Sequence, residues 1–220
     1  RYNLPASQRR RPGKKANPKT EEKAHQKARE NQKISLSDPE SHTLPHRKER
    51  FMQGYNAQSA VCTDTRLIAA TQVSNEPNDS MQLPEILRNL DPKEKAHLGH
   101  LLVDKGYWDS LKLNDLEQQY QCRILCPPKN EGKLLMKAYP EHHPRKRSAA
   151  FKRKMERRFG TQQGKELYKK RSSVSEGVFS VIKNAMNFRS FRIRGLDGAS
   201  TEWSLVTLAY NCRRMVALKS

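Results

Sequence analysis

The sequence has few apolar residues and few acidic ones. Hydrophobic side chains make up 35% of the 220 residues, whereas a typical globular chain has about 45–50%. A compact core can therefore occupy only part of the chain, and the rest is expected to be polar and exposed. Lys and Arg outnumber Asp and Glu by 43 to 23, a formal net charge of +20. This excess predicts a polyanionic partner, either nucleic acid or an acidic membrane surface.

Long apolar runs and paired cysteines are also missing. No run approaches the ~20 apolar residues that a membrane-spanning helix needs, and the first thirty residues contain no apolar segment typical of a signal peptide. Membrane insertion is therefore not expected. The four cysteines, Cys62, Cys122, Cys126 and Cys212, form no Cys-x-x-Cys pair and have no HExxH or His-x3-5-His element beside them. This spacing disfavours zinc and favours buried thiols in a reducing cytoplasm.

Residues 1–33 are strongly basic and contain almost no large apolar side chains. They hold eleven Lys or Arg against three Glu. Such a segment buries too little surface to offset the entropy lost on ordering, so a largely disordered basic arm is predicted. Residues 20–33 are expected to form a polar helix only in context. The arm can act as a solubilising linker or as a DNA contact, and the residues favour neither.

From residue 51 the pattern becomes that of an α/β domain. Two strands joined by a tight turn at Thr63–Thr65 are predicted in GYNAQSAVC and RLIAATQVS. A helix is expected over 80–90, then a strand that ends at Asp104, a helix over 109–120 and a short strand over 122–128. This order of elements predicts a sheet with helices packed on it.

Residues 142–171 form a basic insertion in the predicted domain, which spans residues 34–220. They hold twelve Lys or Arg against two Glu. Two helices then close the chain, over about 174–187 and 200–218. Apolar residues recur at helical spacing in both: Val174, Val178, Val181 and Ala185 in the first, and Trp203, Leu205, Val206, Ala209, Cys212 and Val216 in the second. Both stripes are expected to face the core.

Two carboxylates are distinguished by their context. Asp104 follows an apolar strand and precedes Gly106, so it can face a cleft at the carboxyl end of a sheet. Glu176 lies on the first turn of the predicted helix over 174–187. At 100° per residue, Glu176 falls within about 20° of Lys183 and roughly opposite the valine stripe. Carboxylates brought together from distant positions are what a two-metal phosphoryl-transfer site needs.

Structural roles can explain the same two residues. Asp104 can cap the turn that follows its strand, as Asp commonly does. Ser173 and Glu176 have the spacing of a helix capping box. Composition and periodicity alone leave these alternatives open.

Four blocks of sequence carry a resemblance to a known family. They read SLSDPESHTLPHRKERFMQGYNAQSAV, IAATQVSNEPNDSMQLPEIL, LLVDKGYWD and ELYKKRSSVSEGVFSVIKNAMNFRSFRIRGLDGASTEWSLVTLAYNCRRM. In this order and spacing, from about residue 20 to 218, they resemble bacterial insertion-sequence transposases with a DDE catalytic domain. The last block is the most specific, because it is similar to the family's Tyr-x2-Arg-x4-Glu-x6-Lys signature. That signature is filled here by Tyr168, Arg171, Glu176 and Lys183.

The resemblance implies a fold and a reaction. The fold would be RNase H-like, a mixed sheet flanked by helices, and incomplete here at its N-terminal strand. Asp104 would match the second catalytic acid and Glu176 the third. Both would bind Mg²⁺ or Mn²⁺, with two ions expected in the intact family. The reaction would be phosphodiester hydrolysis and strand transfer in DNA transposition.

The resemblance also implies contacts with transposon ends and target DNA. Tyr168, Arg171 and Lys183 match positions that the family uses around the phosphate backbone. Most of the sequence-independent affinity is expected from the basic stretch 145–158. Its candidate contacts are Arg145, Lys146, Arg147, Lys152, Arg153 and Lys154. The bacterial cytoplasm, at the nucleoid, is the expected location, and self-association is left open.

The sequence departs from the family pattern in two places. In the family, the first catalytic Asp lies upstream of a basic linker, and the sequence resembles that linker from residue 1 onward. Asp38, Asp64 and Asp79 are not expected to replace this first Asp. The chain alone is therefore expected to cut DNA at a negligible rate. Beside the third acid, Gly177 and Ser180 occupy positions where the family usually has Pro and Gly. A non-catalytic DNA-binding remnant is the alternative, whereas a generic RNA-binding protein explains only the charge.

Overall fold

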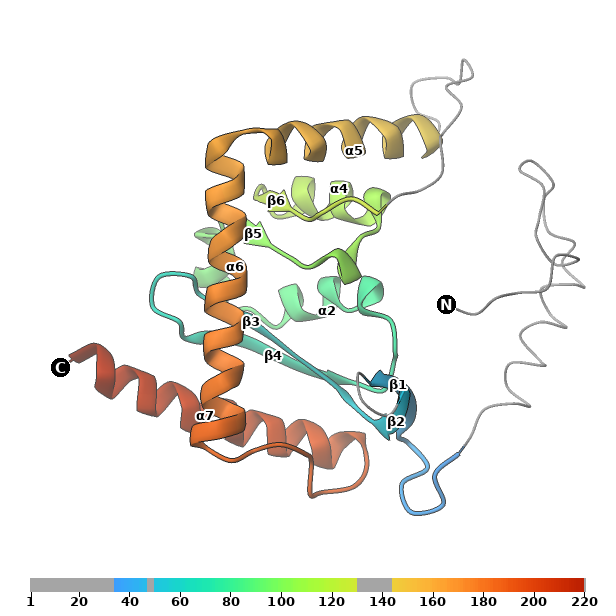
Figure 1. Ribbon diagram of the computed structural model, residues 1–220, viewed down its shortest axis with the longest axis vertical. Coiled ribbons are helices and arrows are strands. Elements are labelled where there is room, and N and C mark those ends of the chain that lie inside the picture. Colours follow the sequence, from blue (N-terminus) through green and yellow to red (C-terminus); the bar gives the residue numbers. More distant parts are fainter. Residues whose placement is uncertain (1–33, 47–49, 130–143, 220) are drawn as a thin grey trace, which may run out of the picture. The chain divides into compact units, whose positions relative to one another are not determined.

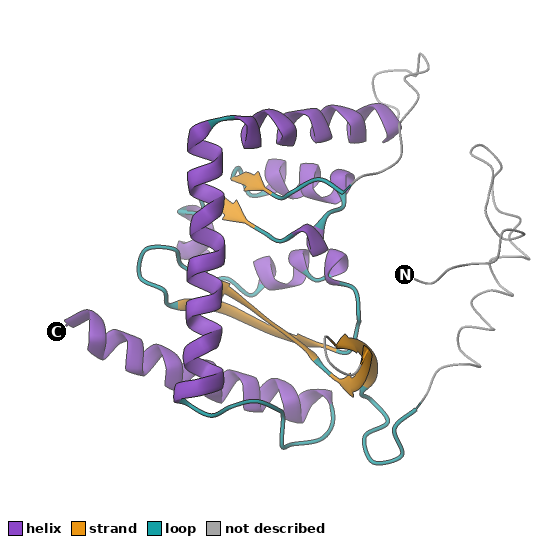
Figure 2. Cartoon of the chain, viewed as in Figure 1, coloured by secondary structure: helices purple, strands orange, loops and turns teal. Residues whose placement is uncertain are grey.

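A computed structural model describes residues 34–46, 50–129 and 144–219 (Figure 1). From Ser35 onward the chain forms one unit, which contains both helices and short strands (Figure 2). The fold is therefore mixed α/β, as the order of sequence patterns predicts. The basic arm predicted over 1–33 lies outside the described residues. Within the described ranges, no helix has the length and apolar character needed to cross a membrane.

The described strands form three separate two-stranded sheets rather than the single predicted sheet. The strands are β1 (His42–His46), β2 (Arg50–Gly54), β3 (Asn56–Val61), β4 (Ile68–Ser74), β5 (His100–Leu102) and β6 (Arg123–Leu125). β1 pairs antiparallel with β2, and β3 pairs antiparallel with β4. β5 and β6 are parallel. The β3–β4 hairpin and the positions of β5 and β6 confirm the predicted strands, whereas the pattern analysis did not predict β1–β2.

Helices make up most of the remaining described residues. They are α2 (Leu83–Arg88), α3 (Pro92–Ala96), α4 (Ser110–Gln119), α5 (Pro144–Gly160), α6 (Gln162–Ser180) and α7 (Leu196–Lys219). Two 3-10 turns, η2 (Asp79–Met81) and η3 (Lys105–Tyr107), precede α2 and α4, and the π-helical segment η4 (Val181–Ala185) continues α6. Asp109 and Thr161 begin α4 and α6 because their side chains accept backbone N–H groups of the first turn.

The helix predicted over 174–187 begins earlier, at Gln162. Glu176 therefore lies well inside α6 and not on a first turn. Ser173 is not a cap, since its hydroxyl donates to the carbonyl oxygen of Lys170 at 3.1 Å, so the capping-box interpretation is wrong. Residues 162–173 have little apolar periodicity but are rich in Gln, Lys and Glu, which favour helix.

One hydrophobic core lies where α2, α4 and α5 pack around the β5–β6 pair. Its fully buried members include Leu87, Leu113, Ile124, Cys126 and Met155. Apolar side chains from every one of these helices are therefore removed from water in a single cluster, which stabilises the loop that follows β5.

A second core joins α6, η4 and α7 to the β3–β4 hairpin through Ile68, Val178, Ile182, Trp203 and Tyr210. Polar contacts reinforce it. The indole of Trp203 donates to the carbonyl oxygen of Gln58 at 3.1 Å. The side-chain amide of Asn211 bonds both the N–H and the C=O of Ile68, each at 2.8 Å.

The apolar stripe predicted to bury α7 is wrong in most of its members. Trp203 is buried, but Leu205 and Val216 are 60% and 72% exposed, and Ala209 and Cys212 are exposed too. The buried face of α7 consists of Ala199, Trp203, Thr207 and Tyr210. In the preceding stripe Val174 and Val178 are buried but Ala185, in the π-helical η4, is exposed; Ile182, four residues after Val178, is buried.

The SDPES segment ties the start of the described chain to the start of α7. Asp38 Oδ1 accepts the hydroxyl of Tyr55 at 2.7 Å and the N–H of Gly195 at 3.3 Å. Glu40 Oε2 accepts the N–H of Leu196 at 2.6 Å. These carboxylates therefore satisfy backbone donors at a helix N-terminus, where negative charge is also favourable.

Candidate active site and basic groove

Asp104 lies in the loop that leaves β5, directly after the buried Val103. Its Oδ1 accepts the N–H of Lys105 at 2.7 Å, so it caps η3. The side chain nevertheless remains 61% exposed. The capping role and the accessible carboxylate required of a metal ligand are therefore compatible.

Helix α6 brings two signature residues next to this loop. Arg171 Nη2 lies 3.9 Å from Asp104 Oδ1, and the Arg171 guanidinium carbon lies 5.3 Å from the centre of the Tyr168 ring. The Tyr168 ring in turn packs edge-on against Phe159, with ring centres 5.0 Å apart. Such stacking fixes the plane of the guanidinium. Arg171 Nε is buried and has no hydrogen-bond partner among the described residues.

The end of β6 supports the other side of the Asp104 loop. The buried Cys126 thiol donates to the carbonyl oxygen of Asp104 at 3.3 Å. Burial, followed by the charge of Asp104, raises the pKa of Cys126 to about 12. The thiol therefore stays protonated near neutral pH and keeps its hydrogen bond. Lys129 Nζ donates to the carbonyl oxygen of Gly106 at 3.4 Å.

Asp79 approaches the same loop from η2. Its Oδ1 accepts the side-chain amides of Asn56 at 2.7 Å and Gln58 at 3.0 Å. A Cβ on Gly106 would lie 2.9 Å from Asp79 Oδ2, so only glycine permits this approach without a shift. Burial, and then the charges of Asp79 and Asp104, raise the pKa of Tyr107. The sequence gives no reason to expect Asp79 at this site, because it places Asp79 in the loop after the β3–β4 hairpin.

Glu176 and Lys183 are both exposed and have separate partners. Glu176 Oε1 accepts the hydroxyl of Ser172 at 2.5 Å, and Lys183 Nζ lies 5.9 Å from the centre of the Phe179 ring. The predicted common face assumed 100° per residue, whereas Lys183 lies in the π-helical η4. The structure thus joins Tyr168 and Arg171 to Asp104. Among the described residues we find no hydrogen bond or ion pair that links Glu176 or Lys183 to them.

The predicted DNA-binding cations of the basic stretch 145–158 lie on α5, on different sides of the helix. Arg147 and Lys154 face a cavity beside α4. Arg153 is exposed and Lys152 is half-buried. Arg145 and Lys146 belong to the first turn of α5, but their side chains lie outside the described residues.

A buried carboxylate, Glu117, organises part of this basic surface. Its oxygens accept hydrogen bonds from Lys154 and Arg158, each at 2.6 Å, and from the N–H of Ile124 at 3.2 Å. Burial alone would raise the pKa of Glu117, but the hydrogen bonds from Lys154 and Arg158 outweigh it and hold the pKa below its usual value. Glu117 is therefore ionised at neutral pH and fixes two cations of α5.

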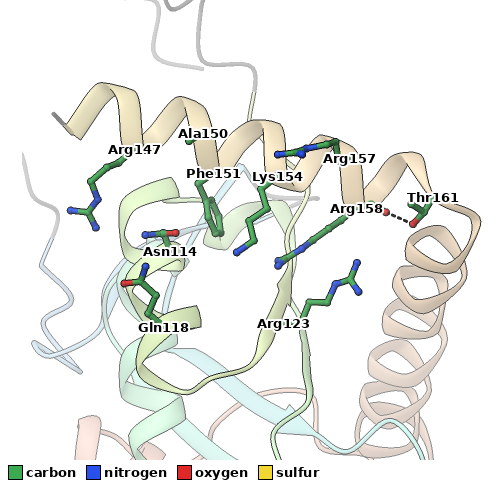
Figure 3. A pocket seen from close by; sticks show the side chains of 10 residues that line it. All are labelled: Asn114, Gln118, Arg123, Arg147, Ala150, Phe151, Lys154, Arg157, Arg158 and Thr161. Carbon is green, nitrogen blue, oxygen red and sulfur yellow. Dashed lines mark hydrogen bonds between the residues drawn. The ribbon is translucent and has the colours of Figure 1, made fainter. Parts of the chain in front are cut away.

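Beside Lys154 and Arg158 a cavity of about 690 Å³ opens between α4, α5 and β6 (Figure 3). It is lined by Asn114, Gln118, Arg123, Arg147, Ala150, Phe151, Lys154, Arg157, Arg158 and Thr161. Lys154 and Arg158 extend from α5 toward β6, and Arg123 extends from β6 toward them (Figure 3). The lining contains cations and amides but no carboxylate.

Comparison with known proteins identifies the family of the chain. The family model described as Transposase DDE domain matches residues 12–212. No curated protein and no solved structure gives a significant match. The matched segment includes both candidate acids and the whole of α5.

Proposed function

Because this chain belongs to the transposase DDE domain family, we propose that it binds DNA and contributes Asp104 and Glu176 to metal-dependent phosphodiester hydrolysis and strand transfer. The contact between Arg171 and Asp104 supports this most directly. It holds the loop after β5 against α6, the helix that also contains Glu176. Arg171 and Glu176 are separated by only about 7.5 Å of helix rise.

The donor chemistry fits Mg²⁺ or Mn²⁺. Both ions prefer carboxylate and water oxygens, and each takes about six such ligands. Asp104 and Glu176 supply oxygens from two side chains, so water, DNA phosphates or another carboxylate must complete a site for two ions. A bound ion would lower the pKa of the attacking water and stabilise the leaving oxygen. We expect the 220-residue chain alone to hold such ions weakly and to cut DNA at a negligible rate.

The neighbouring cations would position the DNA backbone. Arg171 lies at the long limit of an ion pair with Asp104, and its side chain is 26% exposed. It therefore retains donors for a phosphate, which its planar fork can bind with two hydrogen bonds. Tyr168 would hold that fork in orientation, and Lys183 would act as a point charge. The α5 cations Arg145, Lys146, Arg147, Lys152, Arg153 and Lys154 would add sequence-independent affinity.

The fold we propose for the catalytic domain is RNase H-like, over residues 34–220, with residues 1–33 as a basic arm and 142–171 as a basic insertion. The β3–β4 and β5–β6 pairs already share a core, since Ala60 and Ala70 pack in one cluster with Leu101 and Ile124. Each strand has only one described pairing neighbour. One further strand that pairs with both β3 and β5 would join the two sheets into a single mixed sheet.

A non-catalytic DNA-binding protein is the second candidate. It is favoured by one observation: within the described ranges, no group of three or more His, Cys, Asp or Glu side chains could hold a metal ion. Under this alternative the basic surface binds DNA, while Asp104 has the structural role of capping η3.

Mn²⁺ binding distinguishes the two candidates. Binding is followed by electron paramagnetic resonance in the wild type, Asp104→Asn and Glu176→Gln, with the exposed turn variant Asp64→Asn as a charge-matched control. We expect each site variant to weaken Mn²⁺ binding and the control to leave it unchanged. Wild-type affinity in both site variants would show that these acids do not bind the ion and would favour the second candidate.

DNA binding and cleavage complete the test. Duplex DNA should bind the wild-type chain with a steep salt dependence, and the chain should leave the DNA intact in Mg²⁺ or Mn²⁺. Absence of DNA binding would refute both candidates. Efficient nicking would refute the expected inactivity of this chain while supporting the enzymatic role.

A further inference from the structure

We propose that the cavity between α4, α5 and β6 is a groove for the phosphate backbone of DNA, in which Arg123 and Arg157 make the principal contacts. This inference rests on the proposed function, which supplies DNA as the polyanion. It adds a binding site apart from the two candidate metal ligands. Arg123 lies outside both the basic stretch 145–158 and the family signature, and Arg157 lies in that stretch but is not among its six candidate contacts.

The lining cations divide into paired and unpaired ones. Arg147 is 2.5 Å from Asp115, and Lys154 and Arg158 are each 2.6 Å from Glu117. Arg123 and Arg157 have no ion pair among the described residues. Five cations against two carboxylates leave an excess of three positive charges at the groove.

The paired cations form the fixed part of the groove. Arg158 is only 11% exposed, and besides Glu117 it donates to the carbonyl oxygen of Ile124 at 2.6 Å. Its donors are therefore largely used within the protein. Lys154 is 45% exposed and keeps some capacity for a phosphate. Since Glu117 neutralises part of this charge, the largest change in DNA affinity should follow the loss of Arg123 and Arg157.

The opposite wall carries neutral hydrogen-bond donors. Asn114 and Gln118 lie one turn apart on α4, so their amides share one face of the helix. Amides and cations facing one another suit phosphate oxygens, which accept hydrogen bonds but do not donate them. The aromatic residue of the lining, Phe151, is buried, so it offers no surface on which a base could stack. The groove should therefore bind backbone without reading sequence.

The length of the groove favours a strand over a single anion. Arg147 and Arg157 both line it and are ten residues apart on α5, which corresponds to about 15 Å of helix. One strand of duplex DNA presents a phosphate about every 3.4 Å along the duplex axis, so this length would span about four phosphates of a duplex whose axis is parallel to α5. An isolated phosphate ion would contact only part of the groove.

Salt-dependent DNA binding tests the groove. The affinity of a fluorescent 30-base-pair duplex is measured by anisotropy between 50 and 200 mM KCl for the wild type and for Arg123→Gln/Arg157→Gln. The matched control, Lys93→Gln/Arg213→Gln, removes the same charge from exposed positions on α3 and α7. The groove variant should lower the magnitude of the slope of log binding constant against log salt concentration by about 2, which is about 1 for each arginine removed. The control should keep the wild-type slope, and circular dichroism shows whether each variant is folded.

Three outcomes separate this inference from the proposed function. If the wild type binds DNA and both double variants keep its slope, the groove is not a DNA site, although the proposed function stands. If millimolar inorganic phosphate at constant ionic strength displaces the duplex completely, the groove takes free anions and the inference is also wrong. If the wild type does not bind DNA, the proposed function itself fails.

Discussion

Replacing Glu117 by Gln should destabilise the protein, because this carboxylate joins α4, α5 and β6. It accepts hydrogen bonds from Lys154 and Arg158 at 2.6 Å each and from the N–H of Ile124 at 3.2 Å. Glu117 is 8% exposed and Arg158 11% exposed, so water has little access to replace a lost partner. Gln keeps the shape and one carbonyl oxygen but removes the charge that balances Arg158.

The expected loss follows from the burial of this pair. Removing one partner of a buried ion pair costs about 3–5 kcal/mol, because the other charge remains without compensation. Lys154 is 45% exposed, so its share is screened by water. The lower end, about 3 kcal/mol, is therefore expected. In a chain of this length that corresponds to a decrease in Tm of about 6–12 °C.

The effect should also depend on pH. Burial would raise the pKa of Glu117, but the hydrogen bonds from Lys154 and Arg158 hold it below the usual value. A carboxyl whose folded pKa is depressed adds stability above its unfolded pKa of about 4.3, and this stability is lost as the pH falls through the folded pKa. The difference between wild type and variant should therefore be complete at pH 7 and shrink below about pH 4.

Thermal and urea unfolding, followed by circular dichroism, measure both effects. Glu156→Gln is the control, because Glu156 is an exposed carboxylate on α5, the helix that contains Lys154 and Arg158, and it should change stability by less than about 0.5 kcal/mol. If Glu117→Gln at pH 7 is as stable as this control, the carboxylate does not join the three elements as described. A difference in stability between the wild type and Glu117→Gln that grows as the pH falls would contradict the lowered pKa of Glu117.

Two further substitutions test contacts around the candidate site and the second core. Gly106→Ala should lower the free energy of unfolding in urea by about 1–3 kcal/mol, because the new Cβ would lie 2.9 Å from Asp79 Oδ2. The control, Gly160→Ala, places its Cβ where no atom lies within 4 Å, so it should be neutral or stabilising. Equal stability of the two variants would refute the close approach. Asn211→Leu removes both 2.8 Å hydrogen bonds to the backbone of Ile68 and should lower the free energy of unfolding by about 2–4 kcal/mol. A free energy of unfolding equal to that of the wild type would mean that water replaces the amide.

Local patterns predicted the elements that lead to the site. Two segments joined by a tight turn at Thr63–Thr65 predicted β3 and β4, and the apolar run before Asp104 predicted β5. The register of the last helices was not predictable in the same way. α7 buries Thr207 and Tyr210 and bonds β4 through Asn211. Hydropathy assigns these polar side chains to the surface, so the apolar stripe was right for Trp203 and Val206 but wrong for its other members.

The candidate site depends on contacts between residues far apart in the sequence. Family resemblance selected Asp104, Arg171 and Tyr168, but no local spacing could show that the ends of their side chains meet. Asp79 carried no signal of its own, because its approach to Gly106 arises only when η2 and η3 pack together. Pairing of cations with Glu117 likewise requires α4 and α5 to be in place.

Asp104 and Glu176 must lie close enough to share one divalent ion if the proposed site is correct. Fe²⁺ can replace Mg²⁺ at such a site, and with ascorbate and peroxide it produces radicals that cut the polypeptide near the bound ion. We expect cuts near both Asp104 and Glu176 in the wild-type chain, suppressed by excess Mg²⁺ and absent in Asp104→Asn. Cuts near only one of the two residues, or cuts that excess Mg²⁺ does not suppress, would contradict a shared metal site.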